Sequence, residues 1–234
     1  MGALPPPTDE ELRDAARIVE AFRAAHKLPM LTARMGLQSC VSTKRYVIGR
    51  DAEITQRLKR RLTVWDKLRR EPTMKLSRMQ DIGGCRAVLP SLNAIAQVRD
   101  RFTANSRRRD NREDRVIDYV EHPRDSGYRA VHIRTHYRGR RVEVQLRTRW
   151  QHRWARIVED LTNRVGVDYK SGSGPEDVHR LLIVMSDTFA ERDAQGQDPA
   201  ALDNELRGLM AQVAEAGGLG VIAGTTNIEE LGWT

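Results

Sequence analysis

The sequence has few of the features that mark secreted or membrane-bound proteins. It contains two cysteines in 234 residues, and Cys40 and Cys85 lie too far apart in the chain to form a metal-ligand pair. No apolar run approaches the roughly 20 residues that a membrane span requires. Residues 1–12 lack the basic and apolar regions of a signal peptide. We therefore expect a cytoplasmic protein with reduced thiols and no membrane partner.

The sequence also lacks a Walker loop, the backbone cradle that many proteins use to hold a triphosphate. If a triphosphate binds here, cationic side chains must hold it. Cations are what the sequence has in excess, because its net charge is +8 at pH 7. This charge favours anionic partners such as nucleotides, RNA or other phosphates, without distinguishing between them.

The residue pattern predicts an α+β domain with a mixed, largely antiparallel sheet flanked by helices. A capping box between Thr8 and Glu11 begins a helix that ends near residue 26, and an irregular stretch follows it. Strands are predicted at 85–89, 116–120, 128–137 and 142–148, and further helices at 52–70, 92–102, 150–162, 176–193 and 199–215. We divide the chain into an N-terminal helical segment (1–43), a central domain (44–174) and C-terminal helices with a tail (175–234).

The last two predicted strands alternate between apolar and polar residues. In V-E-V-Q-L-R (142–147) every second residue is polar, so a strand would place Glu143, Gln145 and Arg147 on the same face. The preceding strand places His132 and Arg134 on its polar parity, and a hairpin would set these two beside the first three. A solvated sheet face would show a similar alternation. Side chains with fixed hydrogen-bond geometry instead favour a binding surface.

A second candidate group begins at Asp81, which is followed by Gly83 and Gly84 at the start of a predicted strand. Glycines there let the backbone approach a ligand closely. Asp81 and the mid-strand Glu143 together would suit Mg²⁺, which takes carboxylate and phosphate oxygens as ligands. An aspartate that only caps a turn is the simpler alternative.

Basic residues cluster on the predicted helix at 52–70. Arg57, Arg60 and Arg61 share roughly one face of that helix, and Lys67 lies close to it. A solvated charged face would look the same. Because there is no Walker loop, these cations are the candidate ligands for a triphosphate.

Together these stretches resemble the synthetase domain of the RelA/SpoT family, the alarmone pyrophosphokinases. The resemblance covers about residues 44–174 and is carried by four motifs in the family's order: R-x-K with a later Lys (57–67), D-I-G-G-C-R (81–86), H-P-R-D-S-G-Y-R-A-V-H (122–132) and E-V-Q-L-R-T (143–148). Thr63 stands where the family usually has Ser. Four motifs in order are highly specific, whereas any one of them alone is weak.

The resemblance implies a nucleotidyltransferase-like fold, Mg²⁺ as cofactor, and transfer of pyrophosphate from ATP to the ribose 3′-hydroxyl of a guanine nucleotide, GTP or GDP. It implies that Asp81 holds the metal and that Glu143 helps to hold it and activates the hydroxyl. The residues it assigns to the ATP phosphates are Arg57, Lys59, Lys67 and Arg86. The residues it assigns to the acceptor are Arg124, Ser126, Tyr128, His132, Gln145 and Arg147, with Tyr128 stacking on the base.

The chain resembles the small, single-domain members of this family, because it has neither a hydrolase-type His-Asp pair nor room for a long regulatory half. Some small members make guanosine or adenosine alarmones. Others are toxins, which put pyrophosphate on the 3′ CCA end of tRNA or make adenosine alarmones, and a toxin would pair with an antitoxin protein. Extra basic residues would suit tRNA: Lys44, Arg45 and the run at 106–109, which we place in a loop. We favour a nucleotide acceptor, because the small members that act on nucleotides form the larger class. An inactive RNA-binding module is a third interpretation. The sequence does not indicate an oligomeric state.

Overall fold

The computed structural model describes residues 8–43, 46–48, 52–110, 114–171 and 173–202. The chain forms two compact units, Met1–Gln195 and Gly196–Thr234, and the elements named below all belong to the first. The predicted helix at 199–215 falls largely outside the described residues, as do Lys44 and Arg45. The predicted division of the chain at residues 44 and 175 stays a prediction.

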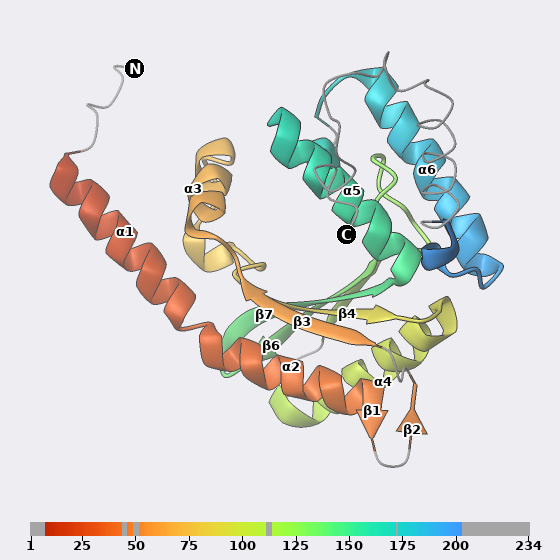
Figure 1. Ribbon diagram of the computed structural model, residues 1–234. Coiled ribbons are helices and arrows are strands. Elements are labelled where there is room, and N and C mark those ends of the chain that lie inside the picture. The colour runs from red at the N-terminus through yellow and green to blue at the C-terminus, as the bar shows by residue number, and fades with distance from the viewer. Residues whose placement is uncertain (1–7, 44–45, 49–51, 111–113, 172, 203–234) are drawn as a thin grey trace. The chain divides into compact units, whose positions relative to one another are not determined.

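A five-stranded sheet organises the first unit (Figure 1). Its strands lie in the order β3 (Glu53–Leu58), β4 (Gly83–Leu89), β7 (Arg140–Thr148), β6 (Val131–Tyr137) and β5 (Arg115–Asp118). The β4–β7 pair is parallel, and the other three neighbouring pairs of this sheet are antiparallel. This confirms the predicted mixed, largely antiparallel sheet. A separate antiparallel pair joins β1 (Ser42–Thr43) to β2 (Tyr46–Val47).

Strands β6 and β7 are joined by a two-residue turn at Arg138 and Gly139. Both residues have positive φ, 50° and 73°, as a hairpin turn matched to the right-handed twist of the strands requires. The resulting register pairs His132 with Gln145 and Arg134 with Glu143. A slip by one residue would turn these polar side chains into the core, so the alternation and the turn fix the same register.

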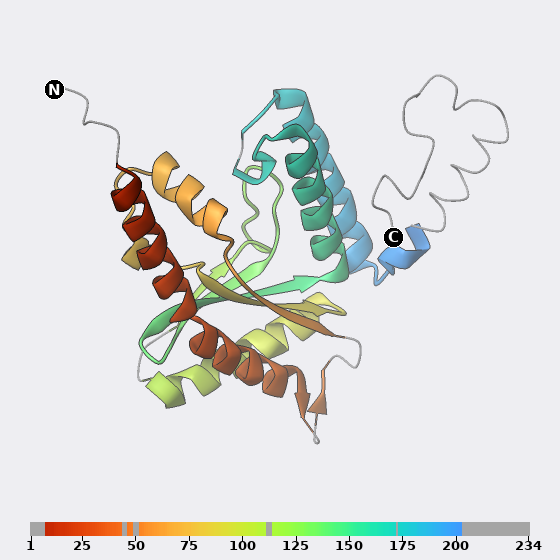
Figure 2. The same cartoon turned by 60° about the vertical axis from the view of Figure 1, so that its left-hand side comes forward.

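The sheet has helices on both sides (Figures 1 and 2). Helices α2 (Lys27–Val41) and α4 (Leu92–Asp110) cover one face, and α3 (Arg61–Arg70), α5 (Arg149–Val165) and α6 (Glu176–Ala194) lie on the other side. The core packs between the sheet, α2 and α4, and includes Leu37, Phe102, Ile133 and Leu146. Each such side chain contributes about 1.5–3 kcal/mol by leaving water. The opposite face of the sheet remains available for polar side chains.

Helix α1 (Asp9–Ala24) begins at the predicted capping box. The backbone N–H of Glu11 donates to Thr8 Oγ1 at 3.3 Å, and the N–H of Thr8 donates to Glu11 Oε2 at 2.7 Å. The expectation of an irregular stretch after this helix is wrong, because α2 follows almost at once. Pro29 lies in the first turn of α2, where a backbone N–H needs no intrahelical partner. Gly36 is buried within α2, so neither residue marks a loop here.

The single helix predicted at 52–70 is also wrong. Residues Glu53–Leu58 form β3, which pairs with β4 along its whole length, and α3 begins only at Arg61. Six residues of pairing at the edge of the sheet outweigh the local preference for helix. Arg57 and Lys59 therefore come from a strand and its end, whereas Lys67 comes from a helix.

Helix α4 extends to Asp110, well beyond the predicted end at residue 102. The run at 106–109 therefore lies on a helix, and the prediction of a loop there is wrong, although its side chains are outside the described residues. Helix α6 closely matches the predicted helix at 176–193. Within the part of the chain that the structure describes, no helix is both long and apolar enough to cross a membrane.

Candidate active site

The polar face of the hairpin forms the floor of the candidate site, as the alternation predicts. Val142, Val144 and Leu146 are buried beneath it. The side chains above them come from both strands, and those that line the cleft are His132, Arg134, Glu143, Gln145 and Arg147.

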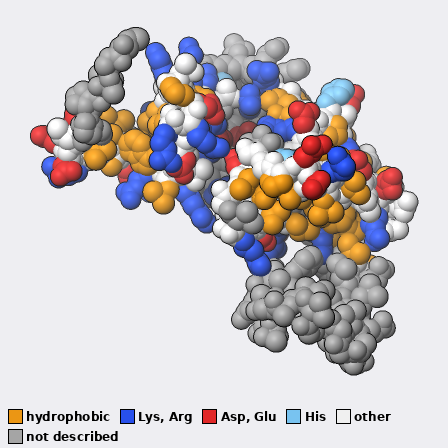
Figure 3. All heavy atoms as spheres, turned by 90° about the horizontal axis from the view of Figure 1, so that it is seen from above, with side chains coloured by type: hydrophobic (Ala, Val, Ile, Leu, Met, Phe, Trp, Pro, Cys, Tyr) orange, Lys and Arg blue, Asp and Glu red, His pale blue; other side chains and the backbone are white. Residues whose placement is uncertain are grey.

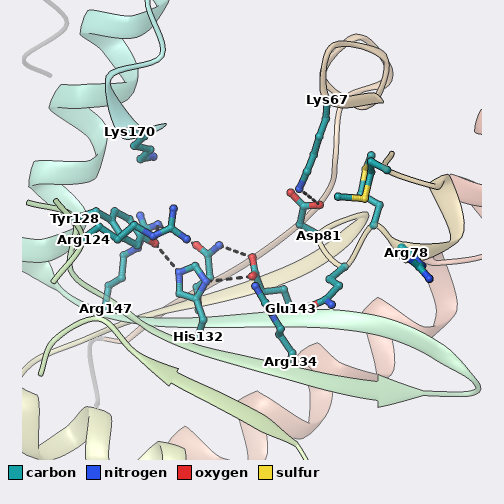
Figure 4. A pocket seen from close by; sticks show the side chains of 14 residues that line it. Lys67, Arg78, Asp81, Arg124, Tyr128, His132, Arg134, Glu143, Arg147 and Lys170 are labelled. Atoms are coloured by element: carbon teal, nitrogen blue, oxygen red, sulfur yellow. Dashed lines mark hydrogen bonds and ion pairs between the residues drawn. The ribbon is translucent and has the colours of Figure 1, made fainter. Parts of the chain in front are cut away.

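The cleft above this face has two compartments. The first has a volume of about 430 Å³ and is shown in Figure 4; it is bordered by Arg124, Tyr128 and His132. The second has a volume of about 300 Å³ and is bordered by the cations of β3 and β4. Five residues line both compartments: Asp81, Glu143, Gln145, Arg147 and Lys170. Two carboxylates thus stand where two bound molecules would meet.

Glu143 is held by its neighbours on the sheet. His132 Nδ1 lies 3.1 Å from Glu143 Oε1, and Gln145 Nε2 donates to Glu143 Oε2 at 2.8 Å. Burial by itself would raise the pKa of Glu143, but the hydrogen bonds with His132 and Gln145 and the charge of Arg134 lower it to about 2. The carboxylate is therefore ionised at every physiological pH.

Tyr128 closes a buried hydrogen-bonded chain that leads to Glu143. Its hydroxyl lies 2.7 Å from His132 Nε2 and accepts a hydrogen bond of 2.7 Å from Arg147. Burial raises the pKa of Tyr128, against the opposing charge of Arg147. The guanidinium of Arg124 lies 5.6 Å from the centre of the Tyr128 ring. An aromatic ring is thus fixed at the wall of the first compartment.

The loop before Tyr128 is anchored to α6 through Gly127. This glycine has φ +83°, and a Cβ there would lie 3.1 Å from Ser186 Cβ and 3.2 Å from Ile183 Cα. The hydroxyl of Ser186 donates to the Gly127 carbonyl at 2.5 Å. Both the backbone conformation and the close approach require glycine. The predicted acceptor loop is therefore held in place by a helix that follows it in the chain.

Asp81 is paired with two lysines. Lys59 Nζ donates to Asp81 Oδ2 at 2.7 Å, and Lys67 Nζ lies 3.5 Å from Oδ1. Figure 4 shows Lys67 reaching down from α3 to Asp81. In the view from above, several basic side chains are visible on this face of the molecule (Figure 3). Helix α3 ends with three basic residues, Lys67, Arg69 and Arg70.

The donor set fits Mg²⁺. Asp81 and Glu143 border both compartments, and Mg²⁺ is commonly bound by one or two carboxylates together with substrate phosphates. In the described parts of the chain no group of three or more His, Cys, Asp or Glu side chains is arranged to hold a metal. A protein site built on these two residues would depend on substrate oxygens for its remaining ligands.

The second compartment concentrates positive charge. The cations that border it are Arg57, Lys59, Arg86, Arg147 and Lys170, and they outnumber its three acids, Asp81, Glu143 and Glu159. Glu159 lies 3.7 Å from Arg57 and 3.8 Å from Lys170. Burial lowers the pKa of Arg86, and the charges of Arg147 and Arg57 lower it further. Nε of Arg86 and Nε of Arg147 are buried without a hydrogen-bond partner. Repelling cations with unused donors are typical of a site for a polyanion.

Comparison with known proteins identifies the family. A family model described as a region found in RelA / SpoT proteins matches residues 56–170. The GTP pyrophosphokinase YjbM of Bacillus subtilis is 30% identical over 174 residues, which are 70% of this chain and 74% of that protein. The chain belongs to the RelA/SpoT family. An uncharacterized protein of Mycobacterium tuberculosis is 32% identical over 152 residues, 59% of this chain and 53% of that protein. The chain thus spans about half the length of these mycobacterial relatives.

Solved structures of RelA/SpoT-family proteins share the fold. The small alarmone synthetase 1 of Bacillus subtilis, bound to its product pppGpp, superposes with a TM-score of 0.59 at 24% identity, over 85% of this chain and 99% of that chain. A GTP pyrophosphokinase family protein of Streptococcus pneumoniae gives 0.53 at 22% identity, over 82% and 94%. The predicted resemblance and the predicted fold class are both confirmed.

Nearly all residues that the family resemblance assigns to the site border one compartment or the other. The exception is Ser126, which is buried and donates to the carbonyl of Lys170 at 3.3 Å. Three charged residues of the cleft were missed: Arg78, Glu159 and Lys170. Neither strand alternation nor a charge cluster marks them, because each reaches the cleft from a segment outside the sheet. The roles assigned to all these residues stay predictions.

Proposed function

We propose that this RelA/SpoT-family protein is an ATP-dependent pyrophosphokinase that transfers the β,γ-pyrophosphate of ATP to the 3′-hydroxyl of GTP or GDP. The observation that carries the proposal is the meeting of two compartments at Asp81 and Glu143. A transfer between two substrates needs two adjoining sites that share the reacting atoms. The relative named GTP pyrophosphokinase supports the choice of a guanine nucleotide as acceptor.

In this proposal ATP occupies the second compartment. Arg57, Lys59 and Arg86 border it, and Lys67 approaches from α3 beside Asp81. Catalysis of phosphoryl-type transfer consists mostly of positioning and charge neutralisation. The unused Nε of Arg86 suits an additional anionic oxygen.

The acceptor nucleotide occupies the first compartment. Tyr128 offers the face or edge of its ring to the base, and Arg124 beside it suits an acceptor phosphate. Arg147 donates a hydrogen bond of 3.0 Å to Gln145 Oε1, which fixes both groups for contacts to the ribose. Ser126 acts indirectly, through the segment that carries Lys170.

The reaction is a substitution at the β-phosphorus of ATP. The 3′-oxygen forms the new bond to phosphorus, and the bond to the α,β-bridging oxygen breaks, so that the electron pair leaves with AMP. The hydroxyl proton passes to the carboxylate of Glu143. That carboxylate is fully ionised, and His132 holds it in position. Because such transition states are loose, a weakly basic carboxylate is sufficient.

Asp81 and Glu143 would hold Mg²⁺ together with phosphate oxygens. When bound, the ion neutralises negative charge that develops on the phosphates. The two lysines that now pair with Asp81 would be released to bind phosphate oxygens themselves.

A direct test is to incubate the protein with ATP labelled in the β- or γ-phosphate and one acceptor at a time. We expect label on GTP or GDP and the release of AMP. Label on an adenine nucleotide, or on the 3′ end of deacylated tRNA, would replace the guanine acceptor while keeping the reaction. RNA binding without any labelled product would overturn the enzymatic proposal. A neutralising antitoxin partner belongs to the toxin alternative, in which tRNA or an adenine nucleotide is the acceptor.

A further inference from the structure

Lys170 occupies a position in the cleft that the proposed reaction has not yet used. It is one of the five residues that border both compartments. The other four already have proposed roles in binding the metal, the hydroxyl or the acceptor. Figure 4 shows Lys170 above Tyr128 and Arg147, across the cavity from Lys67 and Asp81.

The backbone of Lys170 is fixed, unlike that of an ordinary surface lysine. Gly166 ends α5 in the left-handed conformation, with φ 77°, and so turns the chain back toward the cleft. Tyr169 is buried, and Gly174 packs against its ring so closely that a Cβ would lie 2.6 Å from Cε1. The carbonyl of Lys170 accepts the hydrogen bond from Ser126. Two loops thus determine where the side chain begins.

The ammonium of Lys170 is only loosely paired. In the part of the chain that the structure describes, its ion pair is with Glu159 of α5, at 3.8 Å, near the limit for such a contact. The groups that face it are Arg147 of β7, Arg57 of β3, Arg86 of β4, His152 of α5 and the Tyr128 ring at 6.0 Å. Burial and the charge of Arg147 lower the pKa of Lys170 to about 8, although Glu159 opposes the shift. A cation held among cations gains more than an exposed lysine would from a bound anion.

We propose that Lys170 is a catalytic residue that contacts the pyrophosphoryl group of ATP as it passes from the second compartment to the first. The inference rests on the proposed pyrophosphokinase function. Lys170 stays protonated throughout and transfers no proton. It neutralises charge on the phosphate oxygens while the bond to the α,β-bridging oxygen breaks and the bond to the acceptor oxygen forms.

The test compares Lys170→Gln with Lys170→Arg, and uses Lys27→Gln as a matched control. Lys27 is an exposed lysine of α2, on the opposite face of the sheet. We expect Lys170→Gln to lower kcat/KM for ATP about 100-fold, with the larger part of the loss in kcat. The kcat/KM of Lys170→Arg should be at least tenfold higher than that of Lys170→Gln. The kcat/KM of the control, Lys27→Gln, should equal that of the unchanged protein. The melting temperature of each variant should stay within about 2 °C, since the pair with Glu159 is weak.

A pH profile separates a charge role from a packing role. In the unchanged protein kcat/KM should fall as the pH rises through about 8, because Lys170 then loses its proton. Lys170→Arg should move this fall to higher pH, because arginine stays protonated. Turnover of Lys170→Gln within threefold of the unchanged protein would overturn the assignment. The assignment would also be overturned if Lys170→Gln lost turnover together with a large drop in melting temperature, and if Lys170→Arg did not restore that turnover.

Failure of the proposed function is distinguished by a binding measurement. Titration calorimetry with an ATP analogue that has a methylene group between the α- and β-phosphates needs no turnover. If the unchanged protein binds this analogue but labels no acceptor, the pyrophosphokinase proposal fails. If Lys170→Gln then binds the analogue more weakly than the unchanged protein does, and with a smaller dependence on salt, Lys170 still contacts the phosphates. Equal affinity of the two proteins for the analogue would reject that contact.

Discussion

His132 Nδ1 lies 3.1 Å from Glu143 Oε1, across the β6–β7 pair. Because the other ring nitrogen lies 2.7 Å from the Tyr128 hydroxyl, the imidazole links the wall of the acceptor compartment to the carboxylate at the junction. The position of one group thus depends on the others.

Glu143→Gln should remove transfer while keeping the shape of the side chain. The amide cannot accept the hydroxyl proton or neutralise a cation, so we expect kcat to fall at least 10²–10³-fold. Initial rates with labelled ATP measure this, and circular dichroism checks the fold. Glu121→Gln, at an exposed glutamate just before the H-P-R-D-S-G motif, is the control. Substantial turnover by Glu143→Gln would exclude a role for this carboxylate in the reaction.

Asp81→Asn should slow transfer severely, and the rate that remains should need a higher Mg²⁺ concentration to saturate. The variant loses a hard anionic ligand and leaves Lys59 and Lys67 without the acid that pairs with them. The measurement is the rate over a Mg²⁺ titration, next to Asp66→Asn, an exposed aspartate of α3. A normal Mg²⁺ response in Asp81→Asn would mean that the metal binds elsewhere.

Tyr128→Phe should be clearly impaired. If Tyr128 acted only by stacking, phenylalanine would be a mild change. The hydroxyl, however, is bonded to His132 and Arg147 in a buried position, and its loss leaves two polar groups unsatisfied, at a cost of about 1–3 kcal/mol. We expect a raised KM for the acceptor, a smaller effect on ATP, and a lower melting temperature. Tyr128→Ala should raise the acceptor KM further, because it removes the ring as well.

His152 should make the protein sensitive to acid. Burial and the charges of Arg86 and Arg147 lower the pKa of His152 to about 4. The folded state therefore favours the neutral ring. The stability that this preference gives the folded state is fully present above about pH 6.5 and is lost as the pH falls toward 4. Urea unfolding at pH 7 and pH 4.5 should show that His152→Gln loses less stability than the unchanged protein, by on the order of 2 kcal/mol. The exposed His122→Gln should behave like the unchanged protein.

Local patterns were enough to predict much of this molecule. The alternation of V-E-V-Q-L-R placed Glu143, Gln145 and Arg147 on one face because successive side chains of a strand point to opposite sides. The start of the helix at the Thr8 capping box and the hairpin turn at Gly139 could also be predicted, since each depends on residues only a few positions apart. The motifs around Asp81 and Glu143 also carried the family resemblance that the comparisons confirm.

Only the tertiary structure decided which of these residues meet. The local sequence predicts that segment 53–58 belongs to the helix that follows it, but pairing with β4 makes it a strand, and the residues of β4 lie about 30 positions along the chain. The parallel pairing of β4 with β7 brings the segment that carries Asp81 beside Glu143. Lys170 enters the cleft only because Gly166 reverses the chain and Ser126 holds its backbone. Contacts of this kind depend on the packing of segments that lie far apart in the chain, so local residue patterns do not predict them.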